Sequence, residues 1–146
     1  MKKAILFIGL LFIMPNISSA ADQNLDRKQV YELQVQCKQQ SENFFRQWYP
    51  SPSWKDNLDA NWVANFNNHY NKKLNECFIL TTATGLSKRK GKLRTDVLKY
   101  LFDVNENKEH GVYSKVDNTE NECKLLDRFC KSESQWDLLV KQYMEE

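Results

Sequence analysis

The sequence predicts an α+β fold with a long amphipathic N-terminal helix, a short second helix, a three-stranded antiparallel sheet, a C-terminal helix and two disulfides. Three observations support this prediction. Apolar residues recur at helical spacing before residue 48 and after residue 132, a run rich in β-branched and aromatic residues occupies 77–84, and the chain has four cysteines. Residues 21–146 are the size of one domain, and we expect a single disulfide-bonded unit there.

Residues 1–20 have the pattern of a cleavable signal peptide. Lys2 and Lys3 give a positive start, residues 4–14 are apolar apart from Gly9, and small residues precede Ala21. A membrane anchor would need about 20 consecutive apolar residues, and this run is shorter. We therefore expect cleavage after Ala20, a periplasmic or secreted protein, and no transmembrane segment in the mature chain.

The charges balance once this segment is removed. Without Lys2 and Lys3, 19 basic residues face 19 acidic ones, so the mature net charge is zero. A neutral exported chain argues against a nucleic-acid partner. The charges are unevenly spread, with a net +5 over residues 21–100 and −5 over 101–146, which predicts either a charged face or attraction between the two halves.

Two helices are predicted before residue 71. The first covers Asp26–Trp48, because its apolar residues lie on one helical stripe, and it must end before the prolines that follow. The stripe consists of Val30, Leu33, Cys37, Phe44 and Trp48. The second covers Ser53–Tyr70, where large side chains recur every four residues. They are Trp54, Leu58, Trp62, Phe66 and Tyr70. Asparagine is abundant here and lowers helix propensity, so this helix should fray near residues 67–73.

The rest of the chain predicts three strands and a last helix. Residues 77–84, 93–104 and 110–116 favour strands, with a loop at 85–91 and a polar turn at 105–108, which together make an antiparallel meander. Ser132 is positioned to cap a C-terminal helix in which Gln135 completes a capping box. Its apolar stripe is Trp136, Leu139, Val140 and Tyr143.

The four cysteines, Cys37, Cys77, Cys123 and Cys130, are expected to form two disulfides in an oxidising compartment. Four cysteines allow three pairings. We favour Cys37 with Cys77, which joins a helix to the sheet, and Cys123 with Cys130, which closes a short terminal loop. The spacing contains no C-x-x-C motif and fits neither thioredoxin chemistry nor a common zinc site.

Two segments resemble small exported proteobacterial proteins of unassigned function. One is His69-Tyr70-Asn71-Lys72-Lys73-Leu74-Asn75-Glu76-Cys77-Phe78, and the other is the ending from Cys130 through Trp136 and Tyr143 to Met144. Together they cover about 25 residues. The resemblance supports the domain boundary and the disulfide framework, and it implies no activity, ligand or site residue.

No motif predicts catalysis, a cofactor or a metal site. His69 and His110 lack a nucleophile motif such as G-x-S-x-G. The segment starting at Asp103 imitates a calcium loop, but Lys108 stands where the loop needs glycine and Ser114 where it needs glutamate. A hairpin turn with Asx chemistry, in which Asp or Asn side chains bind the backbone, is the better interpretation. The acids at 56, 59, 103 and 106 do not by themselves form the carboxylate pair of a glycoside hydrolase.

Eight aromatic rings lie within 27 residues, interleaved with Asn and Ser. They are Phe44, Phe45, Trp48, Tyr49, Trp54, Trp62, Phe66 and Tyr70. Exposed rings beside amides suit sugar binding, whereas rings between helices and a sheet form a core. We favour the core, with one or two rings exposed near the Pro50–Pro52 turn.

The sharpest local signal is a run of cations with no acid between Glu76 and Asp96. It consists of Lys88, Arg89, Lys90, Lys92 and Arg94. Such a loop can bind phosphate or sulfate groups, although a solvated charged loop has the same composition. We predict an exported, non-enzymatic protein that binds anionic lipid headgroups or acidic glycans. The alternatives are an inhibitor or immunity factor for a cell-wall enzyme, and a glycan-directed hydrolase.

Overall fold

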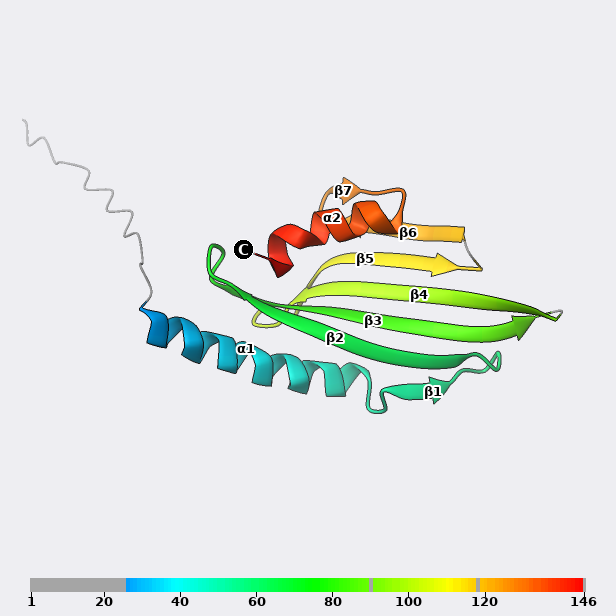
Figure 1. The fold of residues 1–146 in the computed structure, drawn as a ribbon, viewed down its shortest axis with the longest axis horizontal. Coiled ribbons are helices and arrows are strands. Elements are labelled where there is room, and N and C mark those ends of the chain that lie inside the picture. The colour runs from blue at the N-terminus through cyan, green and yellow to red at the C-terminus, as the bar shows by residue number, and fades with distance from the viewer. Residues whose placement is uncertain (1–25, 90, 118, 146) are drawn as a thin grey trace, which may run out of the picture.

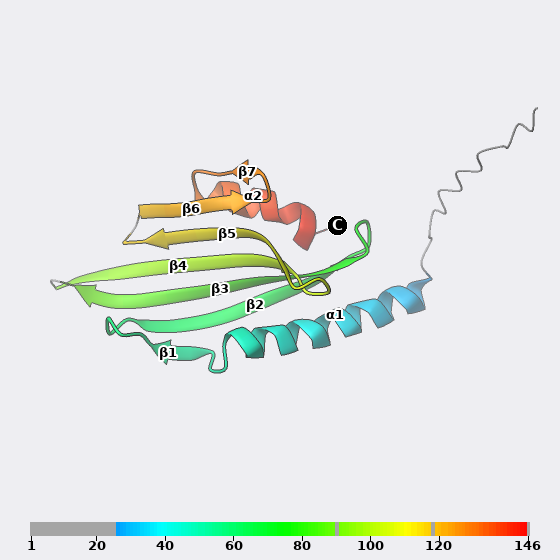
Figure 2. The same ribbon diagram turned by 180° about the vertical axis from the view of Figure 1, so that it is seen from behind.

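The computed structural model describes residues 26–145 except Lys90 and Asn118, and over these residues the chain forms one seven-stranded antiparallel sheet with two helices (Figures 1 and 2). The predicted signal peptide, residues 1–20, lies outside the described residues. Among the described helices, none is long and apolar enough to cross a membrane.

The strands follow one another across the sheet in chain order. The elements are α1 (Arg27–Trp48), β1 (Ser53–Lys55), β2 (Asn61–Asn71), β3 (Glu76–Arg89), β4 (Lys92–Asp103), β5 (Lys108–Val116), β6 (Thr119–Leu125), β7 (Arg128–Phe129) and α2 (Glu133–Met144). Both predicted terminal helices are therefore confirmed. Asp26 is the N-cap residue of α1 and Ser132 that of α2.

The prediction of a three-stranded sheet is wrong, because the sheet has seven strands. The three predicted strands correspond to β3, β4 and β5, and four more flank them. The loop predicted over residues 85–91 is also wrong over most of its length, since β3 continues to Arg89. Gly85 pairs with Trp62 and Asp96 on the two neighbouring strands. The Trp62 ring covers it so closely that an added Cβ would lie 2.6 Å from the indole.

The helix predicted over Ser53–Tyr70 is wrong as well, since this segment contains β1 and β2. A spacing of four residues fits one face of a helix, but it also fits one face of a strand, because side chains alternate every two residues. In β2, Trp62, Phe66 and Tyr70 share the sheet face that carries Ile79 and Ala83 of β3. Hydrogen bonding of β2 to β1 on one side and to β3 on the other therefore outweighs any helical preference of this segment.

The two helices pack on opposite faces of the sheet, because neighbouring residues of a strand contact different helices. On the face that we call the α1 face, Ile79 and Phe102 pack with Phe44 and Phe45 of α1. Phe78 and Leu101, their neighbours in sequence, point to the α2 face. There they pack with Tyr113, Leu125 and Trp136. The centre of the sheet is consequently buried on both sides.

Both disulfides have the pairing expected from the sequence. Cys37 of α1 is joined to Cys77 of β3, and Cys123 of β6 is joined to Cys130, just before α2. Cys37 and Cys77 are almost completely buried. The first bond ties α1 to the sheet, and the second fixes the turn that leads into α2. Two disulfides are compatible with an exported protein.

Lys99 ties α2 to the sheet through two carboxylates. Its Nζ lies 2.8 Å from an oxygen of Glu133 and 2.9 Å from one of Asp137. Burial disfavours the ammonium, but the hydrogen bonds and charges of these carboxylates outweigh burial, so the pKa of Lys99 is raised. On the same face, burial raises the pKa of Tyr113 and of Tyr143.

We expect these groups to make the protein unfold more readily only in strongly alkaline solution. A folded-state pKa that is raised means that the folded chain keeps its proton longer than the unfolded chain. The stabilisation is therefore complete below the usual lysine and tyrosine range of about 10 and is lost as the pH rises through the raised values. Urea unfolding between pH 8 and 11 measures this, and Lys99→Met should give a shallower decline than the wild type.

Candidate functional site

The predicted cationic loop is the tip of the β3–β4 hairpin, at one end of the sheet (Figure 1). The register pairs Arg89 with Lys92, Lys88 with Leu93, and Ser87 with Arg94. We call residues 86–95 the basic hairpin. Lys90 lies outside the described residues, and so does the side chain of Arg89.

The described cations of the basic hairpin do not lie on one face. Lys88 belongs to the α2 face, whereas Lys92 and Arg94 belong to the α1 face, because paired residues share a face and neighbours alternate. Lys88 and Lys92 are both exposed. They therefore form a positively charged end to the sheet, with charge on both of its sides.

Arg94 is engaged within the protein. Its guanidinium forms an ion pair with Asp117 in the β5–β6 turn, and this hydrogen bond and charge raise the pKa of Arg94. The Asp117 backbone N–H in turn donates to the carboxylate of Asp96, 2.9 Å away. Arg94 thus ties the basic hairpin to the β5–β6 turn. Of the described cations predicted to bind anions, it is the one already paired with a carboxylate.

Exposed aliphatic side chains accompany the cations of the basic hairpin. Leu93 is 72% exposed and Leu86 is 45% exposed, and both lie on the α2 face beside Lys88. Val63 of β2 is 56% exposed on the same face. Neither helix covers this end of the sheet. Sequence reasoning did not bring these side chains together, because the pattern predicts a loop at Leu86 and a helix at Val63, and only the strand register places both on one face with Leu93.

Most of the eight clustered rings form core, as expected. Phe44, Phe45 and Tyr70 are buried, whereas Trp48 is 55% exposed and Trp54 is 36% exposed on either side of the Pro50–Pro52 turn. The Trp54 and Trp62 rings are nearly parallel, with centroids 5.8 Å apart. Trp48 stacks on Phe44 with centroids 5.9 Å apart. The end of α1 and the strand that follows it therefore each carry a partly exposed tryptophan.

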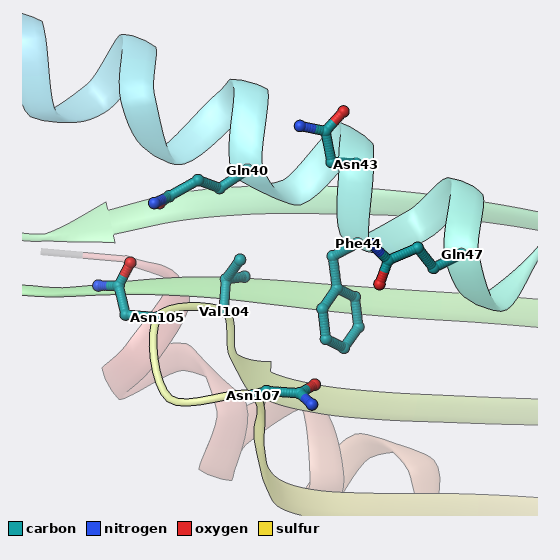
Figure 3. Close-up of a pocket in the computed structure, with 7 residues that line it drawn as sticks. All are labelled: Gln40, Asn43, Phe44, Gln47, Val104, Asn105 and Asn107. Atoms are coloured by element: carbon teal, nitrogen blue, oxygen red, sulfur yellow. The ribbon is translucent and has the colours of Figure 1, made fainter.

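A polar groove lies between α1 and the turn that joins β4 to β5 (Figure 3). We call it the amide groove, and its lining consists of Gln40, Asn43, Phe44, Gln47, Val104, Asn105 and Asn107. Its volume is about 580 Å³. The Phe44 ring points from α1 toward the turn, and five amide side chains surround it (Figure 3).

The turn beside the amide groove is built by Asp103. Its buried carboxylate accepts the backbone N–H of Asn105 at 2.8 Å and that of Glu106 at 3.3 Å. Asn107 has a φ of 51°, a conformation that asparagine tolerates better than most residues. This is the turn chemistry that the sequence predicted. The described residues contain no group of three or more side chains of His, Cys, Asp or Glu that could hold a metal ion.

The other titratable candidates have structural contacts. Asp56 accepts the indole N–H of Trp62 at 2.9 Å and the backbone N–H of Leu58 at 2.8 Å. Asp59 forms an ion pair with Lys55 on the surface. The ring of His110 packs edge-on against Phe78 and Tyr143. These contacts hold turns and core together and place no carboxylate pair across a cleft.

No protein-family model, no curated protein and no solved structure matches this chain. The resemblance noted for residues 69–78 and for the ending after Cys130 therefore stays a prediction.

Proposed function

We propose that this chain is an exported, non-enzymatic binding protein whose basic hairpin attaches reversibly to membranes that carry anionic lipids. The observation that carries the proposal is the exposure of Leu93, at 72%, beside the exposed cations Lys88 and Lys92. Cations are attracted to the headgroup phosphates, and the leucine enters the apolar layer beneath them.

The exposed aliphatic side chains favour lipid over acidic glycan. A glycan would pair with the cations but leave Leu93, Leu86 and Val63 in water. A bilayer satisfies both kinds of side chain. Each lysine near an anionic surface contributes about 1 kcal/mol, and full burial of a leucine side chain contributes about 1.5–3 kcal/mol. Sums of this size predict weak attachment that salt weakens further.

Cosedimentation with vesicles tests the cationic half of the proposal. We expect the mature protein to bind vesicles containing phosphatidylglycerol and to bind pure phosphatidylcholine much less. Lys88→Ser with Lys92→Ser should weaken binding by about 30-fold, from two lysines at about 1 kcal/mol each. Arg94 is left unchanged, because its replacement would break the ion pair with Asp117.

The matched control replaces Lys108 and Lys131, which are also exposed but lie away from the basic hairpin. Their replacement by serine changes the net charge equally and should leave most of the binding intact. Equal losses in the two double variants would mean that overall charge, and not the basic hairpin, governs attachment.

Two leucine substitutions test whether an apolar side chain of the basic hairpin contributes to membrane binding. Leu93 and Leu138 are equally exposed, at 72% and 71%, but Leu138 lies on α2. Leu93→Ser should weaken binding to anionic vesicles, whereas Leu138→Ser should not. If Leu93→Ser binds as the wild type does, and an immobilised sulfated glycan retains the protein equally well, the ligand is an acidic glycan and the lipid assignment fails.

A further inference from the structure

We infer that the amide groove binds an uncharged, linear oligosaccharide. The groove lies between α1 and the β4–β5 turn, at the other end of β4 from the basic hairpin (Figure 1). The strand between them is 12 residues long, or about 40 Å. The inference is therefore independent of the membrane attachment proposed above.

The lining determines the chemical class of the ligand. Side-chain amides both donate and accept hydrogen bonds, and no ionisable side chain of the described residues lines the groove. Within the described part of the chain, the amide groups of Gln40, Gln47 and Asn105 have no protein partner. The Arg46 guanidinium donates to the side-chain oxygen of Asn43 at 2.6 Å and is engaged by the lining rather than part of it. An apolar ligand would leave the amides unsatisfied. Sugar hydroxyls, which also donate and accept, satisfy them.

Aromatic rings lie beside the amide side chains, and sugar-binding sites commonly combine the two. The Phe44 ring points from α1 toward the turn and is 7% exposed (Figure 3), and Trp48 stacks on Phe44 one helical turn further along. Trp48 is 55% exposed, so a flat apolar surface adjoins the amides. A pyranose ring has an apolar face of C–H groups and a polar rim, and this combination matches the two surfaces.

The groove is longer than one sugar ring. A second hollow, of about 200 Å³, shares Gln40 and Asn105 with the amide groove and continues along α1 to Gln36. A third, of about 500 Å³, is lined by Trp48 and Trp54 and shares no lining residue with the amide groove. From Gln36 to Gln47, over the two hollows that do share residues, the helix rises by about 17 Å. A linear ligand follows this line, whereas a single sugar would occupy only part of it.

A peptide is the rival ligand, and the position of the groove disfavours it. Extended peptides usually add to the unpaired edge of a sheet, where backbone groups are free. The groove adjoins the β4–β5 turn, beyond the last ladder pair of Asp103 with Lys108, and its lining residues belong to α1 and to that turn rather than to a sheet edge. Their amide side chains suit a ligand with hydroxyls on several sides.

Titration calorimetry with the disulfide-bonded protein tests the inference. The probes are linear oligomers of one to six units of β-1,4-linked N-acetylglucosamine, β-1,4-linked glucose and α-1,4-linked glucose. We expect at least one series to bind, with an affinity that rises with chain length and then levels off. Gln47→Ala with Asn105→Ala should weaken binding by about 10- to 30-fold through the loss of two hydrogen-bonding groups.

Three further variants sharpen the result. Trp48→Ala should weaken binding similarly, and Asn107→Gly should weaken it while keeping the positive φ of the turn. Gln34→Ala with Gln39→Ala, two exposed amides of α1 outside the groove, should bind as the wild type does. Circular dichroism confirms that each variant is folded. The inference is overturned if no series binds, if the groove variants bind unchanged, or if a capped Gly-Ser hexapeptide binds as tightly as the best oligosaccharide.

Discussion

Replacing both Cys37 and Cys77 with alanine is expected to lower the free energy of unfolding by about 4 kcal/mol. The bond joins residues 40 positions apart, so it removes much of the freedom of the unfolded chain. Cys37 is 1% exposed and Cys77 is 2% exposed, so the pair also forms part of the contact between α1 and β3. Urea unfolding followed by circular dichroism measures the loss.

The second disulfide is the matched control for this experiment. Cys123 and Cys130 are only 7 positions apart, and the same treatment predicts a loss of about 2.5 kcal/mol when both are replaced by alanine. The difference between the two double variants reflects loop length together with the deeper burial of Cys37 and Cys77. If replacing Cys123 and Cys130 lowers the free energy of unfolding more than replacing Cys37 and Cys77, loop length does not determine the loss. The attachment of α2 to the sheet would then be the larger contribution.

Trp136→Ala is expected to destabilise the protein by about 3–5 kcal/mol. Trp136 is fully buried on the α2 face and lies in one cluster with Phe78, Leu101 and Tyr113. Its removal leaves a cavity between α2 and the sheet that the paired strands cannot close. Because tryptophan fluorescence changes with the substitution, circular dichroism is again the suitable probe.

Two other substitutions on α2 show whether the effect is one of packing. Trp136→Phe should destabilise much less, because the buried indole N–H has no hydrogen-bond partner within the described residues and its loss removes no bond. Leu138→Ala, at a side chain that is 71% exposed, should change stability by less than about 0.5 kcal/mol. A loss for Trp136→Phe as large as that for Trp136→Ala would contradict this account.

The two proposed binding surfaces differ in how far the sequence predicted them. The cations of the basic hairpin are adjacent in the chain, so composition alone indicated them. Their division between two faces and the engagement of Arg94 by Asp117 depend on strand register. The amide groove had no sequence signal, because Gln47 and Asn107 are 60 positions apart and meet only when α1 packs beside the β4–β5 turn.

Local interactions were the part of the fold that the sequence determined by itself. The apolar stripe of α1, the Ser132 cap of α2 and the Asp103 turn depend on residues within a few positions of one another, and all three are present. The disulfide pairing also followed from the elements on which the cysteines lie.

The size of the sheet was decided only by tertiary structure. The four-residue spacing of Trp62, Phe66 and Tyr70 fits a helix and a strand equally, and pairing with β3 selects the strand. β6 has few residues of high strand propensity, yet its register places Cys123 and Leu125 in the core. A strand is stabilised by hydrogen bonds to another part of the chain, so the partner, and not the local sequence, decides where it forms.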